Sequence, residues 1–511
     1  MSTKQGTPLW LDRPAPISFD ALAADLAVDV AIVGAGIVGL HCARLLRGSG
    51  RKVVILEARR VGRQATGRST AKVTSQHGLK YASLMRDFGR DAAQLYARFN
   101  QRAVGEIAGI CAELPDRAGL EERDAFIYAE TARQAEQLRE EADVAAALGL
   151  PAEFRSSVAV PMRTEGALRF SGQYQFDPYL YLTGLAGLTR GDGVSIFENS
   201  RVTDIDASTP CVLEVNGHKV TAQTVVVSTQ MPIVNEGLFY AKAYPFAHPV
   251  AAAPLPAGVE IDGMFINTGS PTHSFRTAGK DGQRFVVVAG AEYKTGEPRQ
   301  AETAVADMLA FMKRVFGIAE PSHLWSNEDF RSMDSAAFVG PASSSHPNLL
   351  VAVGFDAWGI TQGTVAAENL AQRIRGEKHA CADLFDATRV KPIAGGPTFV
   401  TENIKVAADL VGGRVLGRKA TAFEDIPPNG GGVVSHGGEY VAVRKTEDGT
   451  VTALSAVCTH LGCLVGWNPV DRTWDCSCHG SRFDEHGEVL SGPAVAPLAP
   501  KPAPPAGKRS G

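Results

Sequence analysis

A cluster of metal-binding residue types near the C-terminus constrains this chain more than any other feature. Four of its eight cysteines are crowded there, with two histidines among them. The pattern has two similar halves, 458–463 (CTHLGC) and 476–481 (CSCHGS), and each offers one thiolate and one imidazole. Two such loops facing each other can hold a two-iron two-sulfur cluster, with cysteines on one iron and histidines on the other. The predicted ligands are Cys458, His460, Cys476 and His479.

Zinc is the alternative metal, because cysteine and histidine at similar spacings also suit tetrahedral coordination. Zinc ribbons use cysteine pairs separated by two residues, whereas one residue separates Cys458 from His460. A zinc site with four ligands would also leave Cys463 and Cys478 without a role. The sequence therefore favours the iron–sulfur cluster.

At these residues the chain resembles the Rieske family, in the form found in respiratory quinol-oxidising complexes. The resemblance implies a disulfide between Cys463 and Cys478 that ties the loops together. Two free thiols are the alternative, since disulfides are unusual in a reducing cytosol. The resemblance also implies that the Ser481 hydroxyl donates to a bridging sulfide and that 492–494 (GPA) cover the cluster.

Two residues depart from the quinol-oxidising pattern. Ser477 replaces a proline, and Phe483 replaces a tyrosine that hydrogen-bonds a ligand sulfur. Such hydrogen bonds stabilise the more negative reduced cluster. We therefore expect a reduction potential below that of the quinol-oxidising members.

A second constraining pattern lies near the N-terminus. Residues 28–33 (VDVAIV) read as a buried strand, and 34–39 (GAGIVG) follow at once. A helix to about Arg47 and a second strand at 52–56 come next, and Glu57 ends that strand. A glycine-rich turn in this context is typical of a dinucleotide site.

Each residue of this turn has a physical role in such a site. Gly34 makes the tight turn, Gly36 lets the backbone approach the pyrophosphate, and Gly39 lets helix and strand pack closely. The helix N-terminus attracts the negative charge of the phosphates. The Glu57 carboxylate can accept a hydrogen bond from a ribose hydroxyl.

The segments 59–71 (RRVGRQATGRSTA) and 348–361 (NLLVAVGFDAWGIT) resemble the flavin motifs of the D-amino-acid-oxidase-like flavoproteins, the glycine and sarcosine oxidase group. The first segment, taken alone, also suits a polar helix cap. Because no cysteine lies between Cys211 and Cys381, where some members attach the flavin covalently, we expect non-covalent FAD. The resemblance implies further FAD contacts from Thr66, Arg68, Ser69, Thr70, Val202, Gly354, Gly359 and Thr361.

The expected fold class is α/β plus all-β. It comprises a Rossmann-like FAD-binding domain with an interleaved β-rich substrate domain, followed by a small β Rieske domain. We also expect one long amphipathic helix from Leu84 to Leu114, with Cys111 in the core. The expected units are an FAD-dependent oxidoreductase at 1–385, with FAD-binding parts at about 25–80, 190–235 and 330–385, a connecting segment at 386–428, the Rieske domain at 429–499 and a disordered tail at 500–511.

Composition excludes several classes of protein. The net charge is -4, and the sequence has no basic stripe. We therefore expect no nucleic-acid partner. No apolar run approaches the roughly 18 residues of a membrane-spanning helix. Residues 1–16 lack the charged-then-apolar order of a secretory signal, and we therefore expect a cytoplasmic protein.

One chain with both cofactors indicates an enzyme, because a flavin takes two electrons from a small molecule and the cluster carries one at a time. We expect an FAD-dependent dehydrogenase or oxidase acting on CH–NH donors, which oxidises a small amine or amino acid. Electrons would leave singly through the cluster to a protein, quinone or oxygen acceptor. The alternative is an electron-transfer flavo-iron-sulfur protein that takes electrons from a protein or quinone partner and has no amine substrate.

The substrate pocket is harder to predict than the cofactor sites. Arg276 is the candidate clamp for a substrate carboxylate, since guanidinium groups bind carboxylates through two parallel hydrogen bonds. No catalytic residue is assigned, because hydride abstraction from a neutral amine can proceed without a general base. Other candidate lining residues, each of which also suits an ordinary structural role, are Lys72, Gln76, His77, Tyr244 and His273.

Overall fold

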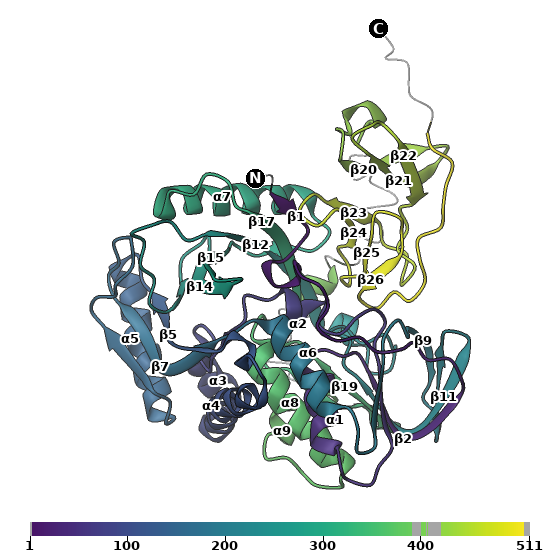
Figure 1. Ribbon diagram of the computed structural model, residues 1–511, viewed down its shortest axis with the longest axis horizontal. Coiled ribbons are helices and arrows are strands. Elements are labelled where there is room, and N and C mark those ends of the chain that lie inside the picture. The colour runs from purple at the N-terminus through teal and green to yellow at the C-terminus, as the bar shows by residue number, and fades with distance from the viewer. Residues whose placement is uncertain (1–2, 391–399, 405, 407–420, 505–511) are drawn as a thin grey trace.

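The structure is a computed structural model that describes residues 3–390, 400–404, 406 and 421–504. Figure 1 shows a large unit of sheets and helices and, at its upper right, a small all-β unit formed by the C-terminal residues. The expected α/β plus all-β class is confirmed. Most of the expected connecting segment, and the tail from residue 505 onward, lie outside the described residues.

The first large sheet is mostly parallel, in the order β18-β19-β11-β2-β3-β8. Its central strands are short apolar runs, as expected for strands buried on both faces. Val30 and Ile32 pack on one face with helices α1 and α8, whereas Ala31 and Val33 pack in a separate core on the other face. The strands of this sheet are β2 (Leu26–Val33), β3 (Val53–Leu56), β8 (Val194–Phe197), β9 (Val202–Asp206), β10 (Cys211–Val215), β11 (His218–Val227), β18 (Phe338–Ser343) and β19 (His346–Val353).

The second large sheet is the interleaved β-rich part. Its main order is β1-β17-β12-β15-β14-β13-β5-β7-β4, and helix α7 covers it through Met308, Phe311 and Met312. The strands are β1 (Lys4–Gln5), β4 (Lys72–Val73), β5 (Glu121–Tyr128), β6 (Ala152–Arg155), β7 (Ala167–Gln175), β12 (Ala243–Pro254), β13 (Met264–Asn267), β14 (Ser274–Lys280), β15 (Gln283–Ala289), β16 (Tyr293–Lys294) and β17 (His323–Ser332).

The predicted long helix from Leu84 to Leu114 is wrong in one respect, because the structure divides it into α3 and α4. Gly89 separates them with a φ of 86°, a left-handed conformation that glycine adopts readily. Cys111 is buried, as expected. The helices are α1 (Ile37–Leu46), α2 (Ala65–Arg68), α3 (Lys80–Phe88), α4 (Arg90–Glu113), α5 (Ala132–Ala147), α6 (Pro178–Thr189), α7 (Pro298–Phe316), α8 (Gly359–Ile374) and α9 (Ala382–Phe385), with short 3-10 turns η1 (Leu9–Leu11), η2 (Arg117–Gly119), η3 (Phe239–Ala241) and η4 (Phe423–Asp425).

The C-terminal unit consists of two small antiparallel sheets. Figure 1 shows the sheet β23–β26 close to the large unit and the sheet β20–β22 farther out. The first loop of the predicted cluster connects β22 of the outer sheet to β23 of the nearer one, and the second loop connects β24 to β25 within the nearer sheet. The strands are β20 (Gly431–His436), β21 (Glu439–Lys445), β22 (Val451–Ser455), β23 (Val465–Asn468), β24 (Thr473–Cys476), β25 (Arg482–Phe483) and β26 (Val489–Ser491).

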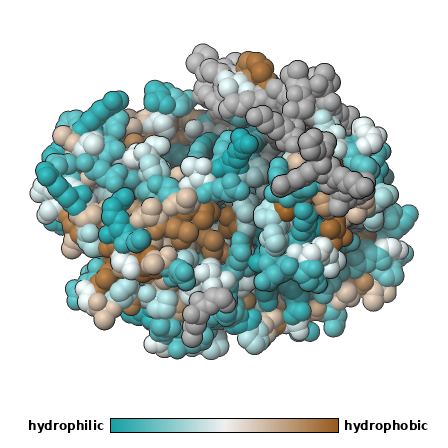
Figure 2. Space-filling view, turned by 90° about the horizontal axis from the view of Figure 1, so that it is seen from above, coloured by the Kyte–Doolittle hydropathy of each residue, from teal (hydrophilic) through white to brown (hydrophobic). Residues whose placement is uncertain are grey.

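One face of the molecule and the helices of the described residues bear on the question of a membrane-spanning segment. In Figure 2 hydrophilic side chains predominate on the face seen from above, and hydrophobic ones gather near the centre of the view. None of the helices in the described part of the chain has the length and apolar character needed to cross a membrane.

The two units approach each other closely at a pair of glycines. Gly466 in β23 lies against the backbone of Gly296, which precedes α7. A Cβ atom at Gly466 would lie 2.5 Å from the Gly296 carbonyl oxygen and 3.3 Å from Cδ of Pro298. The absence of a side chain at Gly466 therefore allows this contact between the units.

We predict that Gly466→Ala destabilises the protein by about 1–3 kcal/mol, because the added methyl group overpacks a tight backbone contact. Urea unfolding followed by fluorescence measures the change. Gly105→Ala is the matched control, since Gly105 is exposed in α4 with open space around it. The control should be neutral or stabilise by up to about 1 kcal/mol. Equal stability of wild type and Gly466→Ala would contradict this account of the contact.

Candidate functional site: a flavin cavity beside an iron–sulfur centre

The two cysteine–histidine loops have the same backbone hydrogen bonds. The Cys458 amide donates to the Cys463 carbonyl at 2.8 Å, and the Gly462 amide donates to the Cys458 carbonyl at 3.0 Å. In the second loop, Cys476 donates to Ser481 at 2.8 Å, and Gly480 donates to Cys476 at 3.0 Å. Both glycines have positive φ, which closes each loop tightly. The repeat seen in the sequence is therefore a repeat of local structure.

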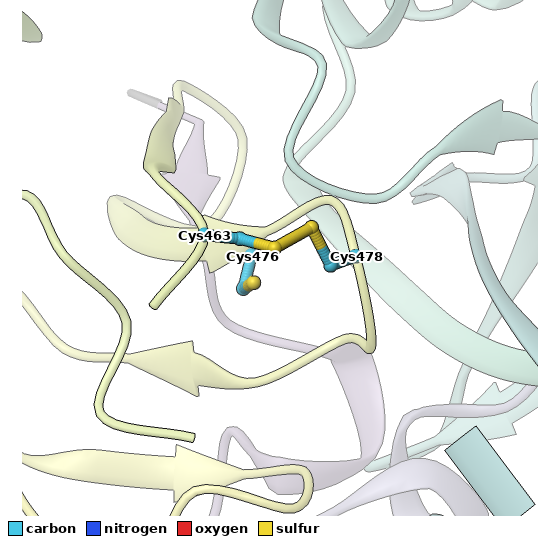
Figure 3. Close-up of side chains that lie close together, drawn as sticks. All are labelled: Cys463, Cys476 and Cys478. Atoms are coloured by element: carbon cyan, nitrogen blue, oxygen red, sulfur yellow. A yellow bond between two sulfur atoms is a disulfide. The ribbon is translucent and has the colours of Figure 1, made fainter. Parts of the chain in front are cut away.

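A disulfide joins the loops, between Cys463 and Cys478, as the Rieske resemblance implied. Figure 3 shows this bond with the Cys476 side chain beside it, and the three sulfur atoms lie within 4.8 Å of one another. Closeness alone would make these three a metal-binding group. The two bonded sulfurs have no thiolate to offer, however, so the predicted ligand from this part of the second loop is Cys476.

The Cys476 thiol faces Cys458 from the other loop. A hydrogen bond between the two side chains lowers the pKa of Cys458 to about 7 and raises the pKa of Cys476. The Ser481 hydroxyl also hydrogen-bonds the Cys458 sulfur. Both cysteines are buried, with 2% and 1% exposure. The structure thus brings one cysteine from each loop together at one place.

The two histidines form the neighbouring edge of the same place. The rings of His460 and His479 are 5.0 Å apart, edge to face. Burial lowers the pKa of His460 to about 4 and that of His479 to about 3, so both are neutral at pH 7, the form that binds metals. Nδ1 of His460 is buried without a hydrogen-bond partner among the described residues. Two cysteines, two neutral histidines and an unpartnered ring nitrogen fit a two-iron two-sulfur cluster.

One side chain of the large unit covers the histidine edge. The Tyr240 ring in η3 lies 5.3 Å from the His460 ring and 5.1 Å from the His479 ring, tilted edge-on to both. The histidine edge of the cluster site therefore faces the large unit.

The glycine-rich turn lines a long cavity in the large unit. Gly34 has a φ of 102°, and the N-terminus of α1 opens into the cavity at Gly36, where no side chain caps the helix. Gly39 faces the other way, and a Cβ atom there would collide with the Gly34 carbonyl oxygen. The turn thus places the N-terminus of α1 at the cavity, where the helix dipole favours a phosphate.

Glu57 ends β3 beside this turn. Its carboxylate accepts the amide of Ala35 at 2.9 Å and that of Arg59 at 2.9 Å. Burial raises its pKa. The carboxyl group lines the cavity with Arg201 and Val202, where the ribose and adenine of FAD would lie.

Seven of the twelve predicted FAD residues line this flavin cavity, and a second cavity adjoins it. The two cavities share Ser69, Asn327, Ala357 and Ile360. Thr70 and Thr361 line the second cavity, whereas Gly39, Arg68 and Gly354 lie outside both. The predicted residues that line the flavin cavity are Gly34, Gly36, Glu57, Thr66, Ser69, Val202 and Gly359.

Arg68 differs most from its predicted role as an FAD contact. Its guanidinium group binds Asp471 of the small unit at 2.7 Å and donates to the Ser326 carbonyl at 3.0 Å. The Arg68 side chain therefore links the two units. It does not itself line the flavin cavity, although it belongs to a helix beside that cavity.

The second cavity contains two of the candidate substrate residues. Lys72 donates to the Ser274 hydroxyl at 2.7 Å, and burial, with the nearby charge of Arg276, lowers the pKa of Lys72 to about 7. His77 stacks on Trp358 with ring centres 5.1 Å apart, and burial lowers its pKa to about 3. This cavity therefore offers one titratable amine and a neutral imidazole.

The prediction of Arg276 as a carboxylate clamp does not agree with its contacts. Its guanidinium group donates to the carbonyls of Thr70, Thr277 and Phe176, and it lies over the Trp10 ring. These donors hold the backbone around the second cavity. Gln76, Tyr244 and His273, like Arg276, lie outside both cavities.

Several residues at the site gave no signal in the sequence. Asn327 and Asp329 of β17 line the flavin cavity, and burial raises the pKa of Asp329 to about 7. His248 of β12 lines the second cavity. The small unit also contributes to the flavin cavity, through Leu490, Ser491, Gly492 and Val495. These residues are far apart in the sequence and come together only in the folded chain, so no local pattern indicates them.

Known proteins match both parts of the chain. Residues 29–373 match the family described as FAD dependent oxidoreductase, and residues 419–502 match the Rieske [2Fe-2S] domain. YhfW of Bacillus subtilis (strain 168), whose name describes it as a Rieske 2Fe-2S iron-sulfur protein, is 32% identical over 482 residues, which are 94% of each chain. Cytochrome b6-f complex iron-sulfur subunit 2 of Trichormus variabilis is 54% identical over 61 residues, 12% of this chain and 33% of that protein.

Solved structures share the fold of the large unit. Glycine oxidase from Geobacillus kaustophilus aligns with a TM-score of 0.59 at 18% identity, over 71% of this chain and 99% of that one. L-amino acid deaminase from Proteus vulgaris aligns with a TM-score of 0.59 at 16% identity, over 74% and 97%. By the match over 29–373 and the full-length relative, this chain belongs to the FAD dependent oxidoreductase family and ends in a Rieske two-iron two-sulfur domain.

Proposed function

We propose that the protein oxidises a small amine or amino acid at the flavin and passes the electrons singly through the Rieske cluster to an acceptor. Bound FAD supplies two-electron chemistry, and the cluster supplies one-electron transfer. The single observation on which this proposal depends is the position of β17 between the flavin cavity and the cluster loops.

Successive side chains of β17 point to opposite sides of the strand. Asn327 and Asp329 line the flavin cavity. Glu328 and Phe330 point the other way, toward Gly480 beside the ligand His479. A Cβ atom at Gly480 would lie 2.9 Å from Oε1 of Glu328 and 2.7 Å from Cζ of Phe330. One strand therefore separates the cavity from a cluster loop, which supports electron transfer within the chain.

The position of Tyr240 also supports electron transfer between the flavin and the cluster. It covers the edge formed by His460 and His479, and it belongs to the large unit. His479 is 4% exposed beside this ring, whereas His460 stays partly exposed. A side chain of the large unit therefore contacts both histidines, which favours electron transfer between the flavin and the cluster within one chain.

The second cavity supports an amino-acid substrate. It adjoins the flavin cavity, and its lysine, Lys72, can pair with a carboxylate when protonated. Several proteins with the same fold are named for amino-acid substrates, among them glycine oxidase, L-amino acid deaminase and L-proline dehydrogenase. We assign the carboxylate contact to Lys72 in place of Arg276.

Anaerobic mixing with pools of amines and amino acids tests the proposed reaction. We expect one pool to bleach the flavin absorbance, and the electron paramagnetic resonance signal of the reduced cluster to follow. Dithionite reduction is the control that both centres are present. If every pool fails while dithionite reduces both centres, the amine reaction is excluded, and a protein or quinone donor becomes the better candidate.

Tyr240→Ala should slow reduction of the cluster without slowing reduction of the flavin by the substrate, because the ring lies at the cluster edge and outside both cavities. Stopped-flow absorbance measures the two rates separately. Tyr240→Phe keeps the ring and should behave as wild type. If Tyr240→Ala changes neither rate, the ring has no part in the transfer.

Lys72→Met should weaken binding of anthranilate, a carboxylate probe, to the oxidised protein. Protonated Lys72 pairs with the carboxylate, so wild-type affinity should fall about tenfold per pH unit above the Lys72 pKa of about 7 and level off below it. The Lys72→Met variant should show no such fall. Flavin absorbance follows the binding. Lys219→Met, at an exposed lysine of β11, is the control, and equal pH profiles for all three proteins would contradict the assignment.

A further inference from the structure

A loop of the Rieske domain lies between the cluster site and the flavin cavity. Leu490, Ser491, Gly492 and Val495 form part of the cavity lining. On its other side the loop packs on the second cluster loop, where a Cβ atom at Gly492 would lie 2.5 Å from Cα of Ser481. The Ala494 amide also donates to the Ser481 hydroxyl at 3.1 Å. One short segment thus contacts both cofactor sites.

Two residues that line the flavin cavity form hydrogen bonds to this segment. Gln64 donates to the Leu490 carbonyl at 2.9 Å, and Arg201 donates to the Val489 carbonyl at 2.7 Å. Both donors line the flavin cavity themselves. The same side chains therefore form the cavity and bind the Rieske domain.

A short distance from this segment, a buried carboxylate of the Rieske domain joins the two units. Asp471 of the Rieske domain is 3% exposed, and its Oδ1 accepts from Arg68 at 2.7 Å and from the Ser326 amide at 3.0 Å. Its Oδ2 accepts from Arg482 at 2.6 Å and from the Ser326 hydroxyl. Arg68 ends helix α2, whose residues Ala65 and Thr66 line the flavin cavity. The Arg68 side chain thus connects the Asp471 carboxylate to the helix that lines the flavin cavity.

We propose that the Rieske domain completes the FAD-binding site, so that FAD binding and docking of the Rieske domain are coupled, with Asp471 as the residue that holds the docked state. Because coupling between two binding events is reciprocal, undocking weakens FAD binding by the same factor by which FAD loss weakens docking. The inference concerns FAD affinity alone, and it stands whether or not the substrate is an amine.

Asp471→Asn tests the proposal, since the amide keeps the size of the side chain and removes the charge that two arginines require. We expect the dissociation constant for FAD, measured by FAD fluorescence on deflavinated protein, to rise at least tenfold, and FAD release to be faster. Glu439→Gln is the control. It breaks the exposed Lys501–Glu439 pair, 2.7 Å in length, within the Rieske domain, and FAD affinity should stay within twofold of wild type.

Hydrogen exchange on the wild-type protein tests the reciprocal effect without any variant. Removal of FAD should speed exchange of the amides at 489–495 and leave those of β21 in the outer Rieske sheet unchanged. The visible absorbance of the cluster shows in each case that the Rieske domain is folded. Wild-type FAD affinity in an Asp471→Asn protein with an intact cluster, or exchange at 489–495 that does not respond to FAD, would overturn the proposal.

Discussion

Two arginines and one aspartate meet at the boundary between the two units, and much of the site geometry depends on them. Arg68, Asp471 and Arg482 have nearly buried side chains, and the hydrogen bonds of the Asp471 carboxylate reach three elements, α2, β17 and β25. Arg482 also binds Asp475, the residue before Cys476, at 3.1 Å. Removal of one member of such a buried group leaves an uncompensated charge, at a cost of about 3–5 kcal/mol. The same ionic contacts therefore fix the cluster loop and the helix beside the flavin cavity.

The strand β17 shows how a single element can serve both cofactor sites. Because side chains alternate along a strand, Asn327 and Asp329 can face the flavin cavity while Glu328 and Phe330 face the cluster loop. Burial raises the pKa of Glu328 to about 8, although the charge of Arg482 and the Thr295 side chain act in the opposite direction. A neutral carboxyl group at this place avoids a fixed negative charge beside the Rieske domain.

The parts of the site that the sequence predicted are those that depend on local structure. The predicted cluster ligands come from two loops of six residues, and the glycine turn needs only one strand and one helix, so their spacing alone is informative. Arg68 was assigned to the cofactor because the segment 59–71 resembles a flavin motif. Its actual partner, Asp471, is 403 residues away in the chain, and nothing in the local pattern indicates that pairing. The lining residues Leu490 and Val495 were missed for the same reason.

Arg276 illustrates how a residue can influence a site that it does not touch. Three of its five N–H groups donate to backbone carbonyls, and the side chain lies outside both cavities. Its charge remains close to Lys72, and together with burial it lowers the pKa of Lys72 to about 7. A lysine with that pKa changes its charge near neutral pH, whereas an arginine in its place would stay charged. Burial, reinforced by the charge of Arg276, therefore gives the second cavity a lysine whose charge changes near neutral pH.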